Sequence, residues 1–246
     1  MLSHLKYSIL LSSSLTITLI CGQFAVAESK KTTENNQEPK IVFNLPTPPN
    51  RGIPLGRHKG GGSRNLCPNG QNLTALVPAN NKIVWGKTIA EHPEFLFYIP
   101  QGSSIEFVLQ DESDNYIYQT TRQINPEDLG ILKIAIPDTA IPLANNKIYQ
   151  WTLSLACNEN NPHAFVYVNG SIEKVTLERE TLEQLETKKE IETAIIYAEA
   201  GIWYDAIALL AELRHQNPDD IDINTIWTEL LKQVDLTAIA SQPIVN

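Results

Sequence analysis

Four basic side chains stand in a glycine-rich stretch that contains no acidic residue, and this pattern could bind an anion. They are Arg51, Arg57, Lys59 and Arg64. Glycines let backbone N–H groups approach a negative group closely, as they do in phosphate-binding loops. The spacing fits neither the Walker A nor the dinucleotide-binding pattern, which disfavours nucleotide binding. We therefore predict either a loop that binds an anion or a partner, or a mobile connector between folded elements.

The cysteines could supply a cross-link. The sequence holds Cys21, Cys67 and Cys157, and the first lies in an N-terminal segment that we expect to be removed. In an oxidising compartment the other two would form one disulfide, Cys67–Cys157. Two buried thiols are the alternative. A metal site is disfavoured, because neither cysteine belongs to a C-x-x-C pair and no paired histidines accompany them.

Residue patterns typical of enzymes are missing from the sequence. No G-x-S-x-G or H-E-x-x-H motif occurs, and the histidines beyond residue 28 are scattered singly: His58, His92, His163 and His215. Four tryptophans could include a sugar-stacking platform: Trp85, Trp151, Trp203 and Trp227. Trp151 instead lies on the apolar face of an alternating strand, and Trp227 lies on the apolar stripe of a predicted helix, so both are expected in cores. We expect no catalytic residue, cofactor or metal, and keep a carbohydrate binder and a hydrolase with an unrecognised site as alternatives.

The N-terminus has the pattern of a secretory signal peptide over residues 1–27. Basic residues precede an apolar run from Tyr7 to Ile20, and small residues at Ala25 and Ala27 suit cleavage before Glu28. The run is too short and too rich in Ser and Thr for a membrane anchor. Lipidation of Cys21 is disfavoured, because the bulky Ile20 precedes it. We predict an extracytoplasmic protein, periplasmic or secreted, that is not an integral membrane protein after cleavage.

After the predicted cleavage site, a polar and proline-rich segment is followed by a strand-rich region. Residues 28–50 are polar and then proline-rich, which favours a flexible leader. Residues 51–177 are then predicted to form a β-sandwich domain. Its strands are rich in β-branched and aromatic residues and lie between Pro, Gly, Asn and Asp. They are Leu73–Val77, Ile83–Trp85, Glu94–Ile99, Ser104–Gln110, Tyr116–Arg122, Ile131–Ile136, Lys147–Cys157 and Ala164–Val175.

Several of these strands alternate apolar and polar residues, as half-buried antiparallel strands do. Ile105, Phe107 and Leu109 share one face of their strand. Tyr149 follows Leu143 at the start of an alternating strand, which resembles the tyrosine corner of immunoglobulin-like sandwiches, where the hydroxyl bonds to the upstream backbone. The pattern predicts an antiparallel immunoglobulin-like β-sandwich.

After Leu177 the hydrophobic period changes from two to about 3.6, which predicts a helical tail over residues 178–236. The expected helices are Glu178–Ala200, Trp203–Gln216 and Asn224–Asp235, the last capped by Asn224. The first two resemble a single tetratricopeptide-type hairpin. Residues 237–246 are expected to be a disordered end. The predicted fold class is α+β: an antiparallel Ig-like β-sandwich followed by an acidic α-helical hairpin tail.

Charge is unevenly distributed along the 246 residues. The whole chain has a net charge of −9, and residues 176–246 hold 14 acidic but only 5 basic side chains. A general nucleic-acid binder needs a basic face, so this class is disfavoured. The acidic tail could steer a partner, which we expect to be another envelope protein, or it could be an ordinary solvated helix face.

Several motifs together resemble a known family. They are the run Arg51–Arg57, the glycines and arginine of Gly60–Arg64, Cys67-Pro68, Leu73–Pro78, Phe95–Pro100, and Tyr149-Gln150-Trp151 continuing to Cys157. Over about residues 51–175 the chain resembles the domain-of-unknown-function family 928 of cyanobacteria. The resemblance implies an exported protein and no particular activity, catalytic residue or cofactor. We expect a non-enzymatic binding or assembly module of the cell envelope.

Overall fold

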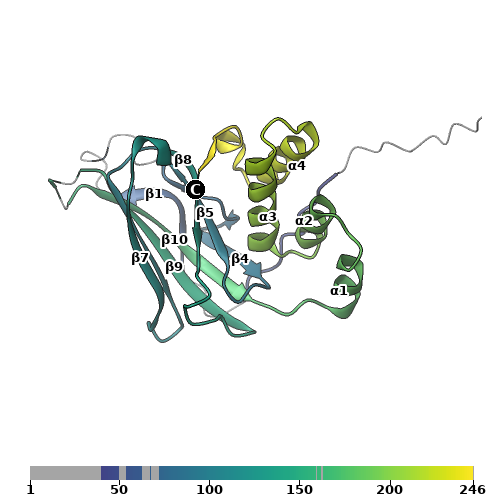
Figure 1. Ribbon diagram of the computed structural model, residues 1–246. Coiled ribbons are helices and arrows are strands. Elements are labelled where there is room, and N and C mark those ends of the chain that lie inside the picture. The colour runs from purple at the N-terminus through teal and green to yellow at the C-terminus, as the bar shows by residue number, and fades with distance from the viewer. Residues whose placement is uncertain are drawn as a thin grey trace, which may run out of the picture. The chain divides into compact units, whose positions relative to one another are not determined.

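The computed structural model describes residues 40–49, 54–62, 67, 72–158, 160–161 and 163–245. All of them belong to one compact unit, Gln37–Asn246 (Figure 1). The predicted signal peptide of residues 1–27 lies outside the described residues, and so do residues 28–39 of the predicted leader.

The described strands form one hydrogen-bonded sheet with the order β11-β8-β5-β2-β1-β10-β9-β6-β7, to which β4 is added beside β10 and β3 beside β4. The pairs β4–β10 and β8–β11 are parallel and the others are antiparallel. The strands are β1 (Arg57–Gly62), β2 (Thr74–Ala75), β3 (Ala79–Asn80), β4 (Ile83–Thr88), β5 (Glu94–Ile99), β6 (Ser104–Gln110), β7 (Tyr116–Gln123), β8 (Gly130–Ala135), β9 (Lys147–Ala156), β10 (Phe165–Lys174) and β11 (Ile244–Val245). Each of the strands expected from the sequence overlaps one of these.

The sheet curls so that β5 packs against strands that are not its hydrogen-bonded neighbours. The ring of Phe95 lies 4.9 Å from that of Phe107 on β6, and Phe97 lies 5.5 Å from Trp151 on β9, measured between centroids. The two halves of the sheet remain connected through the β1–β2 pair. The predicted immunoglobulin-like sandwich is therefore not confirmed. Alternation in a sequence shows which face of a strand is buried, but not which strands pair.

The local feature that suggested a sandwich is nevertheless present. The backbone N–H of Ala144 donates a hydrogen bond to the Tyr149 hydroxyl oxygen at 2.8 Å. Tyr149 is 5% exposed, so this bond satisfies a buried polar atom at the start of β9. The bond of the tyrosine to its upstream backbone is thus confirmed, within a different sheet topology.

Four helices follow the main sheet: α1 (Arg179–Leu185), α2 (Glu190–Glu199), α3 (Trp203–Gln216) and α4 (Ile221–Lys232). The bounds of α3 are those expected from the sequence. The first predicted helix was wrong in its extent, because it is divided between α1 and α2. Asn224 was also wrong as a cap, because α4 begins earlier and Asp220 accepts the Ile223 N–H at 2.9 Å.

The start of α3 is built into the core of the sheet. Trp203 Nε1–H donates to the carbonyl oxygen of Leu76 at 2.8 Å. The Tyr204 hydroxyl accepts from Trp151 Nε1–H at 2.8 Å and lies 3.2 Å from the Ser171 carbonyl oxygen, to which it donates. Burial raises the pKa of Tyr204, so its hydroxyl keeps its proton. The domain boundary expected near residue 177 stays a prediction, while side chains from both sides of it share one core.

Figure 1 shows the consequence of this packing, since α2, α3 and α4 lie together beside β4 and β5. The helices cover a face of the sheet. Gly86 on β4 illustrates how closely they approach, because a Cβ there would lie 3.0 Å from the Tyr204 ring. The helical region is therefore part of the hydrophobic core that positions the strands.

The last residues of the predicted flexible leader are ordered, which corrects that prediction for residues 40–49. Ile41 and Phe43 are buried, and the Phe43 ring packs 4.8 Å from Trp203. The Phe43 N–H also donates to Gln233 Oε1 at 2.8 Å. The non-proline apolar residues of the predicted leader all lie within residues 41–45. This run is too short to form a recognisable period, so its anchoring was not evident from the sequence.

The C-terminal end is also ordered, so the expectation of a disordered end was wrong for residues 237–245. A short 3-10 helix spans Thr237–Ile239, and β11 pairs with β8. Trp227 Nε1–H donates to the Ala240 carbonyl oxygen at 2.9 Å. A distant strand supplies the hydrogen-bonding partner for this end, and local sequence does not reveal such a partner.

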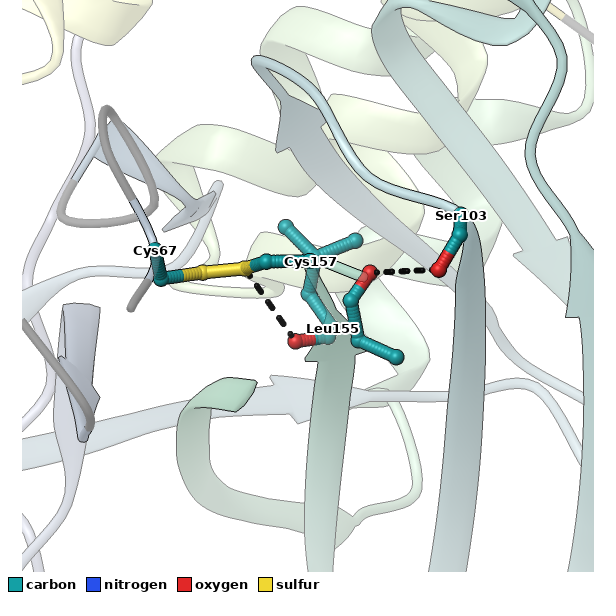
Figure 2. The surroundings of a disulfide bond; sticks show 5 residues. Cys67, Ser103, Leu155 and Cys157 are labelled. Atoms are coloured by element: carbon teal, nitrogen blue, oxygen red, sulfur yellow. Dashed lines mark hydrogen bonds between the residues drawn. A yellow bond between two sulfur atoms is a disulfide. The ribbon is translucent and has the colours of Figure 1, made fainter. Parts of the chain in front are cut away.

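The predicted disulfide between Cys67 and Cys157 is present (Figure 2). Cys67 is fully buried, and its Cα lies 5.5 Å from that of Cys157, within the usual range for a disulfide. The Ser103 hydroxyl donates to the Ala156 carbonyl oxygen at 3.1 Å. The disulfide thus ties the segment after β1 to the end of β9. The hydrogen bond of Ser103 anchors the start of β6 at the same end of β9.

Candidate functional site

A cleft of about 670 Å³ lies where β1, β10 and the turn between β3 and β4 meet, and we call it the basic cleft. Its polar and charged lining comes from segments far apart in the sequence. The lining residues are Leu55, Gly56, Arg57, His58, Lys59, Ala79, Asn81, Lys82, Tyr167 and Asn169. Three of these side chains are cationic and none is a carboxylate, so the cleft suits a negatively charged group.

Strand pairing positions the first cation, Arg57. It pairs with Asn169 of β10, and the register shifts before Gly61 pairs with Tyr167. This irregularity lets β1 turn while its start stays beside β10. The guanidinium carbon of Arg57 lies 5.5 Å from the centroid of the Tyr167 ring, a cation–π arrangement.

Gly61 has a specific role in this arrangement. A Cβ at that position would collide with the guanidinium group of Arg57. The absence of a side chain lets Arg57 fold over β1 toward Tyr167. The contact between the Arg57 guanidinium and the Tyr167 ring thus depends on the absence of a side chain at position 61.

A two-residue hairpin turn positions another cation, Lys82. The turn joins β3 to β4, and both of its residues have positive φ: 48° at Asn81 and 65° at Lys82. Such a turn favours asparagine at the first position and glycine at the second. The Gly56 N–H donates to the Lys82 carbonyl oxygen at 2.7 Å and fixes the turn beside β1.

Arg57, Lys59 and Lys82 are exposed, and among the described residues none of them forms an ion pair. Burial, and then the charge of Lys59, lower the pKa of His58, while Asp235 acts in the opposite direction. His58 is therefore neutral at pH 7, and its ring can donate or accept a hydrogen bond. The cleft thus presents three positive charges that have no ion-pair partner among the described residues, together with a neutral imidazole.

The structure brings only part of the predicted basic loop into this cleft. Arg57 and Lys59 line it, but they lie on strand β1 rather than in a mobile loop, while Arg51 and Arg64 lie outside the described residues. No pattern in the sequence indicated that Lys82, Tyr167 and Asn169 would join them. Asn81 marks a turn, but nothing local places that turn beside β1.

The four tryptophans do not form a sugar-stacking platform, which removes the basis of the carbohydrate-binding alternative. Their exposed fractions are 3% for Trp85, 1% for Trp151, and 0% for both Trp203 and Trp227. Stacking on a sugar requires an accessible ring face. Three of these indoles instead donate hydrogen bonds inside the protein.

His92 lies near a carboxylate. His92 Nδ1 is 3.5 Å from Asp138 Oδ1, and the Asp138 side chain is fully exposed. Within the described part of the chain, no group of three or more His, Cys, Asp or Glu side chains could hold a metal ion. The hydrolase alternative stays a prediction.

A smaller cavity of about 290 Å³ between α2, α3 and the end of β4 is lined by a half-buried carboxylate, Asp205. The N–H of Ile89 donates to Asp205 Oδ2 at 3.1 Å. Burial raises the pKa of Asp205, against the opposing effect of hydrogen bonds from Thr88, Ile89 and Ala90. These hydrogen bonds attach the connection between β4 and β5 to α3. The position of the Asp205 carboxylate is therefore explained by its role in the fold.

The acidic helical region exposes several of its carboxylates to solvent. Glu180, Glu183 and Glu186 are exposed on α1 and just after it, and Arg179 pairs with Glu183 at 3.2 Å. Recruitment of a partner by this region stays a prediction. No described helix is both long and apolar enough to cross a membrane.

Comparison with known families gives one match. The model of a family described as Domain of Unknown Function (DUF928) matches residues 59–244. No curated protein matches the chain. The matched region runs from Lys59 within β1 to β11 and includes all four helices. It therefore extends well past residue 175, where the noticed resemblance ended, but it does not include the run Arg51–Arg57.

Proposed function

We propose that this chain, which belongs to the DUF928 family of domains of unknown function, is a non-enzymatic binding module that holds an anionic group of its ligand in the basic cleft. The observation that carries the proposal is the convergence of Arg57, Lys59 and Lys82 from two separate segments. Like charges brought together at a surface repel each other, and a bound anion relieves that repulsion.

The cleft offers directional contacts as well as charge. The Arg57 guanidinium has five N–H donors in a planar fork, and hydrogen bonds between ionised partners are stronger than those between neutral groups. The Asn169 amide nitrogen lies 3.4 Å from the Leu55 carbonyl oxygen, which holds the side chain at the cleft wall. This combination supports selective binding rather than a diffuse attraction.

We further propose that the protein acts outside the cytoplasm, in the cell envelope, where its ligand would be another envelope component. The disulfide supports this location, because such bonds persist mainly in oxidising compartments. Mass spectrometry of the protein purified from its native cells is expected to show Glu28 as the first residue. Recovery of the intact chain beginning at Met1 from the cytosol would contradict export.

The cleft proposal predicts a local response to small oxyanions. Titration of the ¹⁵N-labelled protein with sodium phosphate, sulfate and citrate at constant ionic strength is expected to shift amide signals of β1, β10 and the Asn81–Lys82 turn. The Arg57→Gln/Lys59→Gln variant removes two of the three charges, so we expect the apparent affinity to fall at least tenfold.

The matched control is Lys40→Gln/Lys188→Gln, which removes two positive charges from exposed positions outside the cleft lining. This variant is expected to bind as the unmodified protein does. If none of the three oxyanions shifts the cleft signals, or if both double variants lose affinity equally, the cleft is not the binding site.

A further inference from the structure

We propose that the group bound in the basic cleft is the dianion of a phosphomonoester, an inference that rests on the proposed binding function. Three cationic side chains line the cleft. A carboxylate, a sulfate monoester or a phosphodiester carries one negative charge and would leave two of the three cations uncompensated. A phosphomonoester carries about 1.5 to 2 negative charges at pH 7.

The chemistry of the three cations also fits a phosphoryl group. A guanidinium can donate two parallel hydrogen bonds to phosphate oxygens, and an ammonium provides a compact charge with three donors. A phosphomonoester has three terminal oxygens that can accept from Arg57, Lys59 and Lys82. The number of terminal oxygens thus equals the number of cations that line the cleft.

The backbone at Lys82 supplies an independent observation. Its φ of 65° is unfavourable for a residue with a Cβ, and glycine would adopt it without strain. Strained residues persist where the surrounding structure holds them, and they concentrate at functional sites. Here the Gly56 N–H holds the Lys82 carbonyl, and the lysine side chain lines the cleft. A lysine thus occupies a position where stability alone favours glycine.

The cleft is larger than a phosphoryl group and can accommodate part of the esterified molecule. Its volume is about 670 Å³, and its wall includes the apolar side chains of Leu55 and Ala79. Leu55 is 67% exposed, so the ester would cover apolar surface that now faces solvent. The phosphomonoester could come from a soluble metabolite or from a lipid headgroup.

Calorimetric titration with phenyl phosphate and phenyl sulfate tests the charge requirement. The two probes share a ring and a tetrahedral head, but at pH 8 the first is a dianion and the second a monoanion. For the full chain with its disulfide intact, we expect phenyl phosphate to bind at least tenfold more tightly. Equal affinities would overturn the phosphomonoester inference and leave the anion-binding function standing, whereas binding of neither probe would contradict the inference.

If neither phenyl ester binds, a second titration shows whether only the phosphomonoester inference fails or the proposed anion-binding function fails as well. The phosphate, sulfate and citrate titration decides whether the cleft binds any oxyanion. If those anions also fail to bind, the proposed function is wrong; if they bind while both phenyl esters fail, only the assignment to an ester is wrong.

Substitution of Lys82 separates its role in binding from its role in folding. Lys82→Gly is expected to weaken phenyl phosphate binding about tenfold while its denaturation midpoint stays equal or rises. Asn146→Gly is the matched control, because Asn146 also has a positive φ, of 59°, but lies outside the cleft lining. This control should retain full affinity. Unchanged affinity in Lys82→Gly would contradict the role of the lysine.

Two further probes distinguish the sources of the phosphomonoester. Glycerol 3-phosphate represents a soluble ester, and vesicles of phosphatidylcholine containing phosphatidic acid represent a lipid headgroup. Binding of glycerol 3-phosphate with an affinity similar to phenyl phosphate indicates a soluble ligand. Sedimentation with the phosphatidic acid vesicles, lost in Arg57→Gln/Lys59→Gln, indicates a lipid. Failure of both probes would overturn the inference.

Discussion

Replacing Trp203 with alanine is expected to lower the free energy of unfolding by about 3–5 kcal/mol, the range for removing a large buried aromatic side chain. Trp203 is 0% exposed, packs against Phe43 and donates to the Leu76 carbonyl. Its loss would leave a cavity at the junction of the leader, the sheet and α3, and would orphan a buried carbonyl group. Chemical denaturation followed by circular dichroism measures the change.

Leu182→Ala on α1 is the matched control, because Leu182 is 49% exposed and its loss should change stability by less than about 0.5 kcal/mol. The sheet and the helices are expected to unfold in the same transition in both proteins, since they share one core. Two separate transitions, with only the helical signal sensitive to Trp203→Ala, would contradict a shared core.

Truncation at Leu177 would remove Trp203 and Tyr204, so point variants are the sounder probes of the helical region.

Loss of the disulfide is expected to destabilise the protein by a similar amount. The bond joins residues separated by 90 positions, for which the loop-entropy model gives about 4–5 kcal/mol. The Cys67→Ser/Cys157→Ser variant should therefore unfold at a much lower denaturant concentration. This effect acts mainly on the unfolded chain, which regains the conformational freedom that the cross-link removes.

The measurement is a urea denaturation of the unmodified protein and the double variant, each with and without a reducing agent. Reductant should bring the unmodified protein down to the stability of the variant and leave the variant unchanged. If the two proteins are equally stable without reductant, the cross-link does not form in solution. If reductant destabilises the variant as well, it acts on something other than this bond.

Local features were the most predictable part of the fold. The expected strands all overlap observed ones, the bounds of α3 agree, and the Tyr149 hydroxyl bonds to the upstream backbone as predicted. These features depend on hydrophobic periodicity and side-chain chemistry within about a dozen residues. The misplaced start of α4 is also local, because Asp220 and Asn224 are both suitable caps and only packing decides between them.

The candidate site was only partly predictable for a related reason. Arg57 and Lys59 drew attention because they stand among glycines, a pattern visible in the sequence. Lys82 and Tyr167 are isolated residues whose importance comes from contacts with β1. Pairing between β1 and β10 brings together residues more than one hundred positions apart, and no local signal specifies that pairing.

Local residue patterns revealed which regions of the chain form strands and which form helices, and which two cysteines were available to form a bond. Folding of the whole chain established that the strands join in one curled sheet, that Trp203 and Tyr204 fill its core, and that three cations line one cleft. Backbone preferences and alternating faces are properties of neighbouring residues. The choice of partner strand and helix depends instead on the free energy of the whole core, to which residues throughout the chain contribute.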